Sequence, residues 1–186
     1  MLTKIFRVAY LAVIFTLALS ASAGAPPQAI SPGTPVPEFT FKDQFDKDTK
    51  LPTEYKDKLI LIIAWDRTGN DYMANWMNGV RKVYPAGPNK VVTLVFLAHY
   101  KGAPSFLQDN IKHKFQKTPD GGQNGPILLD WSGTFAKAYG FHDDLTNVYL
   151  VDGKGVLRAT AYGKGTPEEL QPILREIGSL TASAPK

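Results

Sequence analysis

The chain has 186 residues, a formal net charge of +4 at pH 7, 44% hydrophobic and 20% charged residues, and no cysteine. This composition is ordinary for a soluble globular domain. The lack of cysteine excludes a disulfide framework and any catalysis by a thiolate. The basic residues are scattered along the chain, whereas nucleic-acid binding requires a basic stripe or a known module, so we expect no nucleic-acid partner.

The N-terminus has the pattern of a secretory signal peptide over residues 1–23. A stretch with two basic residues precedes the apolar run Val8–Leu19, and Ala21–Ala23 is a small-x-small cleavage site. A transmembrane anchor is the alternative, but the run is short for spanning a bilayer. We therefore expect a periplasmic or secreted protein that begins near Gly24 and has no stable membrane anchor after cleavage.

Composition divides the rest of the chain into three parts. Residues 24–36 are rich in proline, alanine and serine and predict an extended linker. Residues 37–180 carry the regular patterns of a folded domain, beginning with an alternating segment and a charged turn at 43–48. Residues 181–186 are expected to form a flexible tail.

A strand, a helix and a second strand form the centre of the predicted domain. Apolar runs at 59–65 and 91–98 predict two buried strands. Between them, four large apolar residues recur at helical spacing: Met73, Trp76, Met77 and Val80. Strands separated by a helix are expected to run parallel, with both carboxyl ends at one edge of the sheet. Residues 66–68 should therefore lie near His99 and Tyr100.

The remaining patterns predict the second half of the domain. We expect a helix at 104–115, a loop at 118–125, a strand at 126–130, a short helix at 133–139 and a hairpin of 147–152 with 156–162. Thr166–Glu169 is a capping box for a final helix, in which Pro172 is either an awkward interior residue or the start of the regular helix. One core is expected to contain Leu61, Ile63, Trp76, Val92, Leu94, Phe96 and Leu150.

The order of these elements resembles the thioredoxin superfamily, in particular extracytoplasmic redoxins of AhpC/TSA or TlpA-like type. The resemblance covers residues 33–180 and is strongest over Pro126–Gly140 and Tyr149–Gly155. It implies a thioredoxin-like α/β fold: a three-layer sandwich with a central mixed sheet flanked by helices and a redoxin-type insertion. It also implies thiol oxidoreductase or peroxidase activity, in which cysteine caps the helix after the first central strand.

The segment equivalent to the redoxin cysteine motif is Thr68–Asp71, which has no thiol. Thr146 lies at the family's cis-proline position, and a cis peptide bond is not expected there without proline. The free N–H groups of the helix N-terminus can stabilise a bound anion or the carboxylate of Asp71. Thr68 or Asn70 is the expected N-cap. Arg67 can hold a carboxylate or phosphate, although an ion pair with a neighbouring aspartate is the simpler expectation.

Two histidines are expected to reach the same edge, His99 after the second strand and His142 in a loop. A His/His/Asp metal site is conceivable, but the spacing matches no recognised metal motif, so we predict no metal and no cofactor. His113, on a polar helix, is expected to be solvated. The candidate binding edge comprises Arg67, Thr68, Asn70, Asp71, His99, His142 and Thr146.

These patterns predict an exported thioredoxin-like protein without redox activity, acting as a binding, chaperone-like or assembly partner. Its expected partner is another exported protein or a small anionic ligand. The alternative is a non-thiol enzyme built from Arg67, Thr68, His99 and His142. An exposed apolar patch at this edge would favour partner binding. Converging polar groups with perturbed pKa values would favour catalysis.

Overall fold

The computed structural model describes residues 29–117 and 125–182. The predicted signal peptide, the first residues of the predicted linker, most of the loop predicted at 118–125 and residues 183–186 lie outside this description. Among the described residues, no helix has the length and apolar character needed to cross a membrane.

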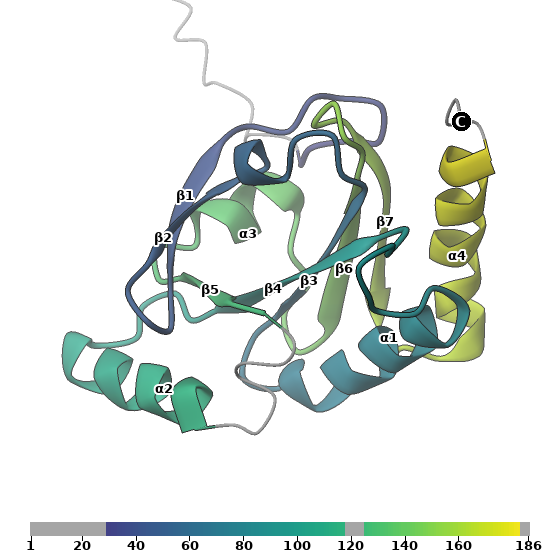
Figure 1. The fold of residues 1–186 in the computed structure, drawn as a ribbon. Coiled ribbons are helices and arrows are strands. Elements are labelled where there is room, and N and C mark those ends of the chain that lie inside the picture. The colour runs from purple at the N-terminus through teal and green to yellow at the C-terminus, as the bar shows by residue number, and fades with distance from the viewer. Residues whose placement is uncertain (1–28, 118–124, 183–186) are drawn as a thin grey trace, which may run out of the picture.

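The described chain forms a mixed sheet of seven strands in the order β2-β1-β5-β4-β3-β6-β7 (Figure 1). The strands are β1 (Phe39–Asp43), β2 (Asp48–Leu51), β3 (Ile60–Trp65), β4 (Thr93–His99), β5 (Ile127–Asp130), β6 (Thr146–Val151) and β7 (Leu157–Gly163). The helices are the short 3-10 helix η1 (Thr53–Tyr55) and the α-helices α1 (Asn70–Val83), α2 (Ser105–Lys117), α3 (Thr134–Tyr139) and α4 (Pro167–Ala182).

The directions of the central strands bring three loops to one edge of the sheet. β3 runs parallel to β4, β4 runs parallel to β5, and β6 runs antiparallel to β3. The ends of β3 and β4 and the beginning of β6 therefore lie together. We call this side the loop edge; its loops are residues 66–69, 100–104 and 141–145. The predicted β-α-β unit is confirmed.

Helices cover both faces of the sheet, which makes three layers. α1, α2 and α4 contribute to the core on one face, and α3 packs with the β1–β2 hairpin on the other. All six residues of β3 are buried because both faces of the sheet are covered. The predicted core is confirmed: Leu61, Ile63, Trp76, Val92, Phe96 and Leu150 belong to one buried cluster, and Leu94 packs against it while partly exposed.

The final helix begins at the predicted capping box. The carboxylate of Glu169 accepts from the N–H of Thr166 at 3.0 Å, and Thr166 Oγ1 accepts from the N–H of Glu169 at 3.4 Å. Pro172 lies inside α4 and does not mark its start. The helix also extends to Ala182, two residues past the predicted domain end, because Thr181 is held by a hydrogen bond from its Oγ1 to the carbonyl of Ile177.

The described part of the predicted linker, residues 29–36, packs onto the domain. The N–H of Ile30 donates to the carbonyl of Ala138, and the N–H of Val36 donates to the carbonyl of Gly155, each at 2.9 Å. Ile30 and Val36 also pack against the core on the α3 face. The side chains of Ile30 and Val36 thus pack against the core, although the composition of this segment predicted an extended linker.

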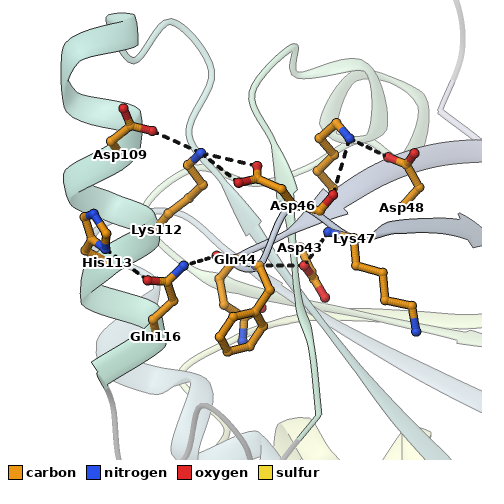
Figure 2. A network of polar contacts seen from close by, with 11 residues as sticks. Asp43, Gln44, Asp46, Lys47, Asp48, Asp109, Lys112, His113 and Gln116 are labelled. Atoms are coloured by element: carbon orange, nitrogen blue, oxygen red, sulfur yellow. Dashed lines mark hydrogen bonds and ion pairs between the residues drawn. The ribbon is translucent and has the colours of Figure 1, made fainter.

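A network of polar side chains connects α2 to the β1–β2 turn (Figure 2). Phe115 is its one buried residue, and Phe106 in the first turn is 73% exposed. Lys112 Nζ lies 3.2 Å from Asp46 Oδ1 in the β1–β2 turn. Near the C-terminal end of α2, Gln116 Nε2 donates to the carbonyl of Gln44 at 2.6 Å. An ion pair and a side-chain hydrogen bond therefore connect α2 to the β1–β2 turn.

Candidate functional site

An open groove of about 520 Å³ lies at the loop edge. Its lining residues come from all three loops: Asp66, Arg67, Thr68, His99, Tyr100, Lys101, Gly102, Ala103, Asp143 and Asp144. Most of these residues are polar or charged and the groove is open to solvent, so the edge is neither an apolar patch nor a closed pocket. Two smaller hollows, of about 230 and 320 Å³, lie at the opposite edge of the sheet, beside the turns that precede β3 and β4.

Asp66 joins two walls of the groove. Its Oδ1 accepts from the N–H of Gly69, and its Oδ2 accepts from the N–H of Asp144, both at 2.7 Å. The prediction of Thr68 or Asn70 as N-cap was wrong, because neither side chain caps the helix. The turn begins directly after β3, as the bond from the N–H of Asn70 to the carbonyl of Asp66 shows. Asp66 thus caps the turn that leads into α1, by accepting from the N–H three residues on, whereas the N-cap residue of α1 itself is Gly69, which has no side chain to cap the helix.

Gly69 is pressed against the loop that leads into β6. A Cβ at this position would lie 2.2 Å from the carbonyl oxygen of Leu145. Thr146 is buried, and its Oγ1 donates to the carbonyl of Gly69 at 2.6 Å. The peptide bond before Thr146 is trans, since the cis bond within the described residues is Leu51–Pro52. Thr146 therefore holds the two loops together and does not line the groove.

The charged residues of the groove do not pair with one another. Arg67 is exposed, and the expected ion pair with a neighbouring aspartate is not among those formed by the described residues. The same holds for Lys101 on one side of Arg67 and for Asp143 and Asp144 on the other. The structure places Asn70 and Asp71 in the first turn of α1, exposed and outside the groove lining.

His99 lies in the groove and is held by a buried carboxylate. Its Nδ1 is 3.3 Å from Asp130 Oδ2, and the two side chains are 11% and 0% exposed. Asp130 also accepts hydrogen bonds from the N–H groups of Gly133 and Ala136 and from Ser132 Oγ. Burial raises the pKa of Asp130, but the interaction with His99, together with the hydrogen bonds from Ala136 and Ser132, outweighs burial and holds the pKa below its ordinary value.

Tyr100, the next residue, is half-buried in the groove wall. Burial raises the pKa of its hydroxyl; the carboxylate of Asp66 raises it further and Arg67 lowers it. The phenol thus senses two charges of opposite sign from the loop that follows β3.

His142 lies outside the groove lining, although it directly precedes Asp143 in the chain. Its ring stacks on Tyr162, with ring centroids 3.6 Å apart and an angle of 20° between the planes. The backbone N–H of His142 donates to Asn147 Oδ1 at 2.8 Å. The two histidines therefore have separate partners, and the conceivable His/His/Asp metal site is not formed. Residues 29–117 and 125–182 hold no group of three metal-ligating side chains.

Sequence reasoning missed four features of this site. It did not assign the capping role of Asp66, the Asp130 partner of His99, the position of Lys101 or the contact of Gly69. Asp66 was recognisable, since aspartate three residues before a helical N–H is a common cap. Asp130 follows a predicted strand and pairs with His99 across parallel strands, which only the strand order reveals.

The chain was compared with known proteins. No protein-family model matches it, and no curated protein matches its sequence. Solved structures do resemble it. The exposed lipoprotein thioredoxin of Streptococcus pneumoniae is 17% identical and matches with a TM-score of 0.58, over 75% of this chain and 99% of that one.

Two further structures also match with a TM-score of 0.58 at 15% identity. A putative thiol:disulfide interchange protein DsbE of Chlorobium tepidum covers 82% of this chain and 99% of its own. BsSco, from the Sco family of cytochrome c oxidase assembly proteins, covers 83% of this chain and 98% of its own. Identity this low shows the fold alone. The chain thus has the thioredoxin-like fold of redoxins, as predicted, and lacks every cysteine on which redoxin chemistry depends.

Proposed function

We propose that this chain is a redox-inactive, thioredoxin-like binding protein that holds a partner in the groove at the loop edge. The observation that carries the proposal is the set of four unpaired charges in that groove, Arg67, Lys101, Asp143 and Asp144. Charged side chains kept side by side without pairing are available to a partner's charges, which determine specificity and association rate.

The shape of the groove also supports binding over chemistry. The groove is open to solvent. Electrostatic catalysis works best where water is excluded, because charges interact more strongly in a site of low dielectric constant. An open polar groove suits a hydrated interface, in which water fills the gaps between the partners.

Export is the second part of the proposal. It is supported by the signal-peptide pattern at residues 1–23. Among the similar structures, one protein is described as an exposed lipoprotein and another as a member of an assembly-protein family. A chaperone-like or assembly role follows from that analogy. Intact-mass measurement of the protein recovered from the cell envelope tests export, with a mature chain beginning near Gly24 as the expected result.

Site-specific crosslinking tests the binding role. A photo-reactive phenylalanine derivative replaces Thr68, which is exposed in the groove, or Arg175, which is exposed on α4 and serves as the control. We expect a discrete crosslinked product in cell-envelope extract from position 68 and none of that mass from position 175. Adding Arg67→Ala should remove the product. The same products from both positions would contradict a binding role for the groove.

The contact between His99 and Asp130 favours a second candidate, a non-thiol enzyme. An imidazole whose Nδ1 faces a buried carboxylate is the arrangement of a general base with its orienting group. Thr68 provides a hydroxyl in the same groove. Hydrolysis of a panel of nitrophenyl esters tests this alternative. Turnover that His99→Ala abolishes and Arg175→Ala leaves unchanged would replace the binding role with catalysis.

A further inference from the structure

We infer that the groove recognises a polypeptide segment that carries one acidic and one basic side chain a few residues apart. The inference rests on the proposed binding function and specifies the chemistry of the partner. It departs from a simple anion site, because the groove presents charges of both signs.

The order of the charges follows from the order of the strands. β4, β3 and β6 are neighbours in the sheet. Lys101 follows β4, Arg67 follows β3, and Asp143 and Asp144 precede β6. The unpaired side-chain charges of the groove are therefore positive on the β4 and β3 side and negative on the β6 side, with the carboxylate of Asp66, bound to two backbone N–H groups, between them. A partner that carries charges of one sign is repelled by one half of the groove. This repulsion discriminates against such partners.

The boundary between the two charged halves is fixed by Asp66. This carboxylate binds the N–H of Gly69 in one loop and the N–H of Asp144 in the other. Arg67 is its direct chain neighbour, so opposite charges are held close to each other by the backbone. The hydrogen bond from Thr146 Oγ1 to the carbonyl of Gly69 adds a second tie. A site held in place before binding loses less conformational freedom when the partner arrives.

The spacing of the strands sets the scale of the partner. Neighbouring strands lie about 5 Å apart, so the side chains that follow β4 and precede β6 are separated by roughly 10 Å at the backbone. An extended peptide rises about 3.3 Å per residue. Acidic and basic side chains two or three residues apart therefore match the positive and negative halves of the groove.

The openness of the groove favours a polypeptide over a small zwitterion. Small-molecule sites bury about 70–90% of the ligand surface. This groove is open to solvent, so it gives a small ligand little enclosure. A polypeptide compensates with contacts beyond the groove, for which the exposed, stacked rings of His142 and Tyr162 lie beside the negative half.

Three fluorescent peptides test the inference by anisotropy titration. Each has ten residues, with glycine, serine and alanine around two charged positions separated by two residues. The charged pairs are Glu and Lys, Glu and Glu, or Lys and Lys. We expect the mixed peptide to bind at least about tenfold more tightly than either uniform peptide.

Single charge reversals should change this preference in opposite directions. Arg67→Glu makes the groove predominantly acidic and should favour the Lys and Lys peptide. Asp143→Lys should favour the Glu and Glu peptide, and Asp144→Asn should weaken the preference for the mixed peptide without adding a bulky side chain where φ is 64°. Arg175→Glu, on α4, is the matched control and should leave the preference unchanged.

Several results would overturn the inference while leaving the proposed function intact. These are equal affinity for the three peptides, no measurable binding of the mixed peptide, or a wild-type preference for the Glu and Glu peptide, while position 68 still yields its discrete crosslink. Displacement of the mixed peptide by inorganic phosphate, at ionic strengths where sodium chloride has no effect, would assign the groove to a small anion. Loss of the crosslink itself would remove the proposed function.

Discussion

Replacement of Asp66 by alanine should destabilise the domain far more than its position beside the groove suggests. Loss of a helix cap costs about 1 kcal/mol. Loss of a charge-assisted hydrogen bond to the loop, here to the N–H of Asp144, costs about 1.5–3 kcal/mol in a buried setting, and less here because Asp66 is partly exposed. We expect about 2–3 kcal/mol in total, since the two hydrogen bonds use different oxygens.

Thermal unfolding followed by circular dichroism at pH 7 measures this effect. For a domain of this size, 1 kcal/mol shifts Tm by about 2–4 °C, so Asp66→Ala should lower Tm by about 4–12 °C. Asp71→Ala is the matched control, because Asp71 is exposed in the first turn of the same helix and interacts mainly with its dipole. That control should cost about 0.5 kcal/mol. Equal shifts for the two variants would refute the claim that the hydrogen bonds of Asp66 to Gly69 and Asp144 hold the two loops together.

Three further predictions concern the core, the loop contact and acid stability. Leu150→Ala should cost about 2–5 kcal/mol in urea unfolding, and Leu94→Ala should cost less because Leu94 is partly exposed; equal costs would contradict the assigned burial. Gly69→Ala should cost about 1–3 kcal/mol, since a Cβ would meet the carbonyl of Leu145; an unchanged Tm would show that the loop moves freely. The folded pKa of Asp130 lies below its unfolded value near 3.9, so its stabilising contribution is complete above about pH 4 and is lost as the pH falls through the folded pKa. Asp130→Asn should therefore lower stability at neutral pH and flatten its decline below pH 4, and an unchanged acid profile would contradict this linkage.

The fold was largely predictable because it depends on patterns that are local in the sequence. The apolar runs of β3 and β4 and the helical face of α1 fix a parallel unit, and this unit fixes the edge at which the groove forms. That geometry also predicts that four of the groove-lining residues lie together: Arg67, Thr68, His99 and Tyr100. The last helix was predicted from its capping box, since both hydrogen bonds join residues three apart.

The contacts that could not be predicted from the sequence depend on where elements begin and on which strands are neighbours. Thr68 or Asn70 was predicted as N-cap because these residue types commonly cap helices. In the structure the carboxylate of Asp66 instead binds the N–H of Gly69, in the turn that precedes α1. His99 was interpreted as a free residue of the edge. Its pairing with Asp130 requires β5 to lie beside β4, a long-range choice that no local pattern specifies.

The weak attachment of α2 has a consequence for the timescale on which the groove changes shape. The wall formed by residues 100–104 leads directly into α2, which buries one side chain, Phe115, and packs a second, Ile111, only partly buried against the core. Its polar contacts with the β1–β2 turn are the ion pair of Lys112 and the hydrogen bond of Gln116. Segments with few buried apolar contacts open at a lower free energy than the global unfolding transition. The amide protons of α2 should therefore exchange with deuterium well before those of β3. Such opening lets the wall of the groove move outward while the sheet and the hydrogen bonds of Asp66 stay intact, so the width of the groove can adapt to its partner.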